Sequence, residues 1–364
     1  MQEISGFQRQ KLNAGGWESG FSILELIVSM VIFMIVTGAV FGVMQVARQS
    51  RSVVSENAGI NKNIRLALNL LGRDTYNAGF GYPLKNTVLL PDNRISTLLG
   101  IPNDVDTSRD TVPPIIAAND INANTYNTTA GTMTDQVTFL FKDSTFNLVG
   151  AVGPPDTRVS QALNINAATT TGGGIDEIVP ISGSNASCRV NDIYLITGNN
   201  GSTLGLATAL SGANIVQFSN GDVLGLNQTG PGGPIRDRTL PASMQRVLMV
   251  TYFVTADGTL TRREFANVPP AVPAVAFVDE PLVYGVENFQ IIYIMDNGTN
   301  VDNPSAGPDG IPGNADDVQN NLDAVRQIRF TVNVRSLELN AARQPYRSTM
   351  TSTFSTRNLG YDAN

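Results

Sequence analysis

The residues that could do chemistry gather most densely between positions 296 and 317. Carboxylates occur there in a glycine-containing stretch, interleaved with asparagines, at Asp296, Asp302, Asp309, Asp316 and Asp317. Hard cations such as Ca²⁺ bind about six to eight oxygen ligands from flexible loops of this kind. The spacing lacks the alternating acids and closing glutamate of an EF-hand. The stretch therefore fits either a calcium loop or a solvated acidic turn between two strands.

The chain has few of the groups that enzymes use. It contains no histidine, which removes the commonest general base, the usual triads and the commonest metal ligand. Cys188 is the only cysteine, so neither a disulfide within the chain nor a cysteine metal cluster can form, and a buried thiol is the simplest interpretation. The glycines at 172–174 are not followed by the Lys-Ser/Thr pair of a phosphate-binding loop. We expect a protein that is not an enzyme and requires no cofactor.

Glu25 is the one chemically unusual residue near the start of the chain. It is the only ionisable side chain between Phe21 and Val46. The apolar run from Leu26 to Val46 would form a helix of about 30 Å, long enough to cross a bilayer. A carboxylate inside such a segment costs roughly 2.5–3.5 kcal/mol at mid-depth. We therefore expect a partner molecule to compensate its charge.

Two glycines inside the apolar run bear on helix packing. Gly38 and Gly42 form a small-xxx-small pair, which lets two helices approach closely or weakens the helix locally. A chance pair of this kind is also common in membrane helices, so both interpretations stay open.

The elements around these residues follow from periodicity. Beyond the apolar run, Ile60, Ile64, Ala67, Leu68 and Leu71 recur at three- and four-residue spacing, which predicts an amphipathic helix that ends between residues 72 and 79. The sequence then divides into residues 21–47 as a membrane-spanning or filament-core helix, 48–79 as its amphipathic continuation, and 80–364 as a globular head.

The head has the period of strands. Alternation is clearest at Gln327–Arg335, and Arg246–Thr255 and Thr259–Phe265 flank a hairpin signal at Asp257-Gly258. No regular helix–strand alternation occurs, so we expect an antiparallel sheet and an α+β fold. Residues 156–180 and 198–235 are rich in glycine, asparagine and threonine and are predicted as loop-rich insertions.

The net charge of the chain limits the kinds of partner that we expect. The net charge is −7 and no basic cluster occurs along the chain, so we expect no direct contact with nucleic acid.

The segment Gly20-Phe21-Ser22-Ile23-Leu24-Glu25 resembles the class III signal of type IV prepilins and pseudopilins, in which Gly and Phe precede a glutamate four positions further on. The resemblance implies that residues 1–20 are a leader, that a prepilin peptidase cuts between Gly20 and Phe21, and that the new amino group of Phe21 is methylated. It also implies a pilin-like, lollipop-shaped fold. Glu25 would neutralise the terminal amine of a neighbouring subunit during assembly.

Motifs in the head favour one family among the pilin-like proteins. Asp74-Thr75-Tyr76-Asn77-Ala78-Gly79-Phe80 looks like the acid-x-Arg-x-Ala-Gly-aromatic signature of PilW-like minor pilins, with Tyr76 in place of the arginine. That family is related to the J-type minor pseudopilin of type II secretion. Four segments are similar to strands of the family: Asp135–Phe139, Asn191–Ile196, Val286–Gln290 and Val325–Ser336.

The resemblance implies a function in assembly. The expected role is that of a minor pilin at or near the tip of a type IV pilus, serving adhesion, twitching motility or DNA uptake. The expected partners are other minor pilins, the major pilin, prepilin peptidase and the inner-membrane assembly platform. The precursor would span the inner membrane once with its head outside the cytoplasm, and the mature form would lie in a cell-surface pilus. A minor pseudopilin of type II secretion and a tip adhesin that binds a surface or ligand stay open as alternatives.

Overall fold

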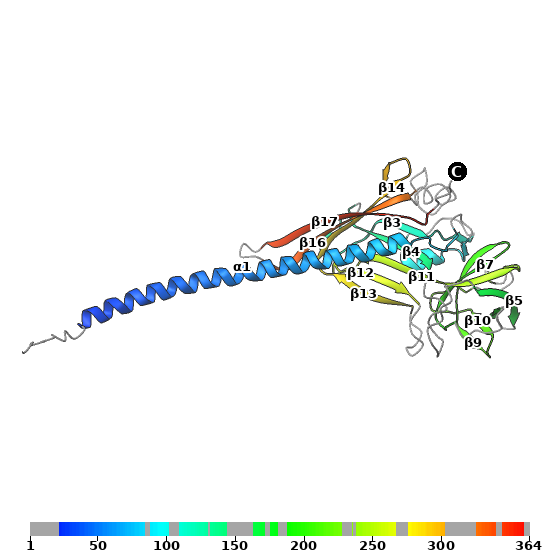
Figure 1. Cartoon of the computed structure of the whole chain (residues 1–364), viewed down its shortest axis with the longest axis horizontal. Helices are drawn as coiled ribbons and strands as arrows, with labels where there is room; N and C mark the ends of the chain where they lie inside the picture. The colour runs from blue at the N-terminus through cyan, green and yellow to red at the C-terminus, as the bar shows by residue number, and fades with distance from the viewer. Residues whose placement is uncertain are drawn as a thin grey trace, which may run out of the picture. The chain divides into compact units, whose positions relative to one another are not determined.

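The computed structural model describes residues 22–83, 88–101, 109–129, 132–143, 163–171, 175–180, 188–227, 235, 238–266, 276–302, 325–339 and 344–359 (Figure 1). An N-terminal helix precedes a domain built mostly of strands. The elements are α1 Ile23–Asn77, β1 Val88–Leu90, α2 Arg94–Leu99, β2 Asp110–Thr111, β3 Ile115–Asn122, β4 Thr134–Lys142, β5 Leu163–Thr171, β6 Ile175–Pro180, β7 Ile193–Gly198, β8 Gly201–Leu206, β9 Ala209–Ser211, β10 Ile215–Ser219, β11 Ala242–Val254, β12 Leu260–Phe265, β13 Phe277–Val283, β14 Val286–Met295, β15 Asn300–Val301, β16 Val325–Leu339 and β17 Pro345–Ser355.

The chain divides into two compact units, residues 1–55 and 56–364. In the first unit the described residues from Ile23 onward belong to α1. This part of α1 is the one described helix that is long and apolar enough to cross a membrane, and none of its most apolar window is buried.

The second unit begins inside α1, whose last turns pack on the sheets. Ile64, Ala67, Leu68 and Leu71 are buried, which confirms the predicted apolar stripe. The helix ends at Asn77, within the predicted range, and Gly79 follows with φ +76°. A left-handed residue at this place is the usual way for a helix to stop, and glycine adopts it without strain.

The strands of the second unit form two sheets. Within the described residues the larger sheet has 13 strands, with β2-β1-β8-β7-β11-β5-β6-β10-β9 as its main path, while β12, β13, β4 and β3 extend from β11. The smaller sheet has 4 strands in the order β15-β14-β16-β17.

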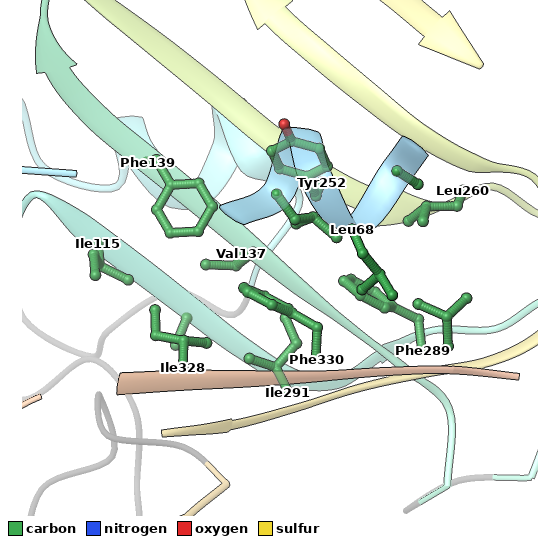
Figure 2. Packing of buried hydrophobic residues seen from close by; sticks show 14 of the residues in the cluster. Leu68, Ile115, Val137, Phe139, Tyr252, Leu260, Phe289, Ile291, Ile328 and Phe330 are labelled. Carbon is green, nitrogen blue, oxygen red and sulfur yellow. The ribbon is translucent and has the colours of Figure 1, made fainter. Parts of the chain in front are cut away.

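The main core fills the space among α1, the β4–β11 part of the larger sheet and the smaller sheet. Leu68 of α1 lies beside the rings of Phe289 and Phe330 (Figure 2). Those two rings stack with centroids 6.2 Å apart and planes 8° apart. Burial of these large side chains from elements distant in sequence supplies the main driving force for their association.

Several predicted strands are confirmed. Gln327–Arg335 lies within β16, and its alternate residues Ile328, Phe330, Val332 and Val334 are buried. The hairpin at Asp257-Gly258 joins β11 to β12, which pair antiparallel, and Gly258 has φ +82°.

The prediction of loops at 156–180 and 198–235 was wrong in part, because β5, β6, β8, β9 and β10 lie there. Glycine normally weakens a strand, which is why this region resembles loop. In β8, however, a β-carbon added at Gly205 would overlap the ring of Phe218 and the side chain of Ile235. Close packing from other elements therefore requires glycine inside this strand.

The expected antiparallel pairing is confirmed for the described strand pairs, with one exception. β1 pairs parallel to β8, with Val88 opposite Ser202 and Leu89 opposite Thr203. The hydroxyl of Thr203 donates to the Leu89 carbonyl oxygen at 2.8 Å. Alternation within a strand carries no information on the direction of its neighbour, so the sequence could not indicate this pairing.

The buried thiol is confirmed. Cys188 lies in a separate core cluster with Ile178, Tyr194 and Phe218.

Candidate assembly site

The first turn of α1 positions Glu25. The backbone N–H of Glu25 lies 3.0 Å from the carbonyl oxygen and 3.3 Å from the hydroxyl oxygen of Ser22, so Ser22 caps the helix. Serine followed three residues later by glutamate is the pattern of a capping box, and a negative charge in the first turn is favoured by the helix dipole. Glu25 thus stabilises the helix start as well as carrying a charge into the apolar segment. Gly20 and Phe21 lie outside the described residues.

The helix presents an apolar surface that nothing in the described chain covers. Phe33, Met34 and Val43 are each about 70% exposed, and their apolar neighbours along the helix are exposed as well. A continuous apolar surface of this length marks a contact with lipid or with other proteins.

Gly38 and Gly42 lie on this exposed part of α1. A β-carbon added to either would meet no atom within 4 Å. The fold of this chain therefore does not require glycine at these positions, and their predicted role in helix–helix packing concerns contacts with other molecules.

The other end of α1 is fixed by a buried acid. Asp74 is 1% exposed, and its Oδ2 accepts hydrogen bonds from the Tyr252 hydroxyl at 2.7 Å and from Nε of Arg262 at 3.0 Å. Burial lowers the pKa of Arg262, but attraction by Asp74 outweighs it and the net shift is upward. Burial, followed by the charge of Asp74, raises the pKa of Tyr252. Asp74 thereby ties the end of α1 to β11 and β12.

The residues after Asp74 explain the rest of this short motif. Ala78 is fully buried, and Gly79 donates its N–H to the Leu140 carbonyl oxygen at 3.0 Å. Tyr76, which stands where the resemblance has arginine, is exposed, and the guanidinium of Arg357 lies 5.5 Å from its ring centroid. The acid and the Ala-Gly pair therefore hold the helix end in place, while Tyr76 contacts the C-terminal segment.

The predicted calcium ligands are described only in part. Asp296 is half exposed and lies 4.0 Å from Arg326, and Asp302 follows β15. Asp309, Asp316 and Asp317 lie outside the described residues. Within the described part of the chain, no group of three acids or cysteines is placed to hold a metal ion. The calcium loop stays a prediction.

Asp135 joins the two sheets, a role that sequence reasoning missed. It is 2% exposed on β4, and its two carboxylate oxygens accept the backbone N–H of Asp120 at 3.0 Å and that of Ile291 at 2.6 Å. Burial raises the pKa of Asp135 to about 7, against the opposing effect of these hydrogen bonds, and the charges of Asp120 and Asp302 add to the rise. The only sequence signal was an acid at the start of an apolar strand.

The raised pKa makes stability depend on pH. Because the folded chain binds this proton more tightly than the unfolded chain, Asp135 stabilises the fold most below about pH 4, and the contribution is lost as pH rises to about 7. We expect the free energy of unfolding of the wild type, relative to Asp135→Asn, to fall by about 2–3 kcal/mol between about pH 5 and pH 8. Denaturant unfolding of the full chain in detergent would measure it. A difference that is constant or grows with pH would contradict this assignment.

Asp192 is a second buried acid with a structural role. Its Oδ2 lies 3.3 Å from Nε of Arg246, which also pairs with Asp143 at 2.9 Å. Burial raises the pKa of Asp192 to about 6, and attraction by Arg246 limits the rise. The cluster links the residue before β7 and the residue after β4 to β11.

No family model, curated protein or solved structure matches the chain. The features that define its class are thus internal: a long apolar N-terminal helix with one acid in its first turn, followed by a mostly β domain.

Proposed function

We propose that this chain is a minor pilin, a subunit that helps to initiate, cap or populate a type IV pilus at or near its tip. One observation carries the proposal: Gly20-Phe21 is followed by an exposed apolar stretch of helix, extending to Val46, in which Glu25 is the single charged side chain. Such a surface requires lipid before assembly and neighbouring helices after it.

The acid gives the assembly its specificity. Cleavage after Gly20 would create a cationic amine at Phe21, one helical turn from Glu25. The carboxylate of one subunit can then pair with the amine of its neighbour, which neutralises both charges in an apolar surrounding and sets the axial register. The leader would be removed by a prepilin peptidase, and the precursor would span the inner membrane with its head outside the cytoplasm.

The contacts of Asp74 suit a subunit that carries load. Force applied to the end of α1 passes through the Asp74–Arg262 pair into β12 and through Tyr252 into β11. A minor pseudopilin of type II secretion would need the same features, and it would be found without surface filaments.

The proposal is tested with a variant that removes the charge of Glu25 and keeps the shape of its side chain. Glu25→Gln is expected to insert into the membrane normally but to reach sheared surface filaments at least about 100-fold less often than the wild type, because removing one partner leaves a buried cation unpaired at a cost of about 3–5 kcal/mol.

The matched control is Glu56→Gln, which removes an acid from the same helix beyond the apolar run and should leave incorporation unchanged. Quantitative immunoblotting of membrane and filament fractions gives both values. Equal incorporation of Glu25→Gln and wild type would reject the role of Glu25.

A further inference from the structure

The long sheet edges of the described chain differ in how they are protected. Among the strands that the structure describes, β13 pairs only with β12, and it carries Asp279, Glu280 and Pro281, three residues that discourage further pairing. β3 has a register irregularity between Ala118 and Asn122, and its first half is buried. Both edges are thus blocked by devices typical of natural sheets.

β17 lacks such devices over most of its length. Among the described residues it pairs only with β16, and its segment Ser348–Ser355 contains no charge and no proline. Threonines at alternate positions favour an extended backbone. Because an unprotected edge is a template for another strand, its persistence requires an explanation.

The register shows which backbone groups point away from β16. The N–H of Thr356 donates to the Arg326 carbonyl oxygen at 3.0 Å, so these opposed residues form a hydrogen-bonded pair. Hydrogen-bonded and non-hydrogen-bonded pairs alternate along antiparallel strands. Thr349, Thr351 and Thr353, which stand an odd number of residues from Thr356, therefore direct their N–H and C=O groups to the outer edge of β17.

A groove runs along this edge. It measures about 400 Å³ and lies between α1, which contributes Arg65, Leu68 and Asn69, and the Thr349–Ser352 part of β17. The Ser348 hydroxyl donates to the side-chain oxygen of Asn61 at 2.7 Å, so helix and strand lie side by side (Figure 1). The groove thus combines unpaired strand groups on one wall with a helix surface on the other.

The helix wall is positively charged. Arg65, which lines the groove, and Lys62, three residues before it on α1, are exposed and form no ion pair within the described part of the chain. We propose that the groove receives an extended segment of another subunit, which adds to β17 as a further strand and directs an acidic side chain toward Arg65. The inference rests on the proposed function only in taking the partner from the same assembly.

A second copy paired through the same edge fits less well. Antiparallel pairing of two β17 strands about Thr351 would bring both copies of Arg65 into one interface, where like charges oppose association. The charge of the groove therefore favours a different, acidic segment over self-pairing.

Hydrogen exchange of the wild type tests the strand addition without knowledge of the partner. In the full chain in detergent, the amides of Thr349, Thr351 and Thr353 should exchange rapidly. In assemblies isolated from native cells they should exchange at least about tenfold more slowly, because each would then donate to the added strand. Equal rates in both samples would overturn the proposal.

Two variants at Thr351 distinguish the contribution of its backbone N–H from that of its side chain. Thr351→Pro removes one outward N–H and leaves the bonds to β16 intact, whereas Thr351→Val keeps that N–H. With a photo-crosslinking residue at Asn69, Thr351→Pro should lower the yield of crosslinked partner at least about tenfold, and Thr351→Val should stay within about twofold of the wild type.

The identity of the crosslinked peptide decides the occupant. An acidic extended segment of another subunit supports the proposal, while a peptide from this chain, in the same or a second copy, overturns it. The N-terminus of the mature protein is read in the same sample. A failed crosslink with normal cleavage after Gly20 rejects the strand addition alone, and an uncleaved chain rejects the proposed function alone.

Discussion

Asp74→Ala is expected to lower the free energy of unfolding by about 3–5 kcal/mol, because it leaves a buried guanidinium without its counter-charge. The side chain of Arg262 is only 11% exposed and has Asp74 as its most buried partner. Its other acids, Glu264 and Glu280, are 29% and 58% exposed, so solvent screens them. The Tyr252 hydroxyl loses its acceptor as well, which adds the cost of a buried unsatisfied donor.

Two further variants make this result specific. Asp74→Asn keeps an acceptor for Tyr252 but not the charge, so its effect should lie between those of wild type and Asp74→Ala. Asp279→Ala removes an acid that pairs with Arg263 at 2.7 Å on the exposed β13, and its effect should stay below about 1 kcal/mol. Denaturant unfolding of the full chain in detergent compares them. Equal losses for Asp74→Ala and Asp279→Ala would show that the buried pair does not anchor α1.

The sequence predicted those elements whose pattern is local. The stripe containing Ile64, Leu68 and Leu71 has the helical period, and its residues are buried as expected. β16 alternates cleanly because one face covers the core and the other faces solvent. In both cases the burial of each residue follows from its own place in the element.

The sequence could not predict features that depend on distant partners. Asp74 and Arg262 are separated by 188 residues, and Asp135 and Ile291 by 156. Nothing near Asp135 in the sequence indicates that the backbone of β14 will meet it. Gly205 likewise made the sequence of β8 resemble that of a loop. The side chains that require glycine there, Phe218 and Ile235, come from later in the chain. Helix α2 was missed because of its length. Its six residues span less than two helical turns, which is too short for a periodic pattern to show.

At the N-terminal site, too, the sequence predicted one feature and the structure added another. The sequence singled out Glu25 by its isolation in an apolar run, and its place in the first turn of α1, where the helix dipole favours a negative charge, adds a second reason for an acid there. Capping alone would be satisfied in an uncleaved membrane anchor. The proposed pairing of Glu25 with a neighbour, by contrast, requires the new amine at Phe21.

Cleavage is therefore expected to be complete, because any subunit that keeps residues 1–20 has no charged amine at Phe21 to meet a buried carboxylate. Unpaired, Glu25 would cost roughly 2.5–3.5 kcal/mol in an apolar interior, which excludes unprocessed chains from the assembly. The methyl group keeps the amine basic and so preserves its positive charge.

Intact-mass analysis of the protein from native filaments measures this directly. We expect a polypeptide of residues 21–364 that carries one additional methyl group on Phe21. A polypeptide in working filaments that still begins at Met1 would contradict it.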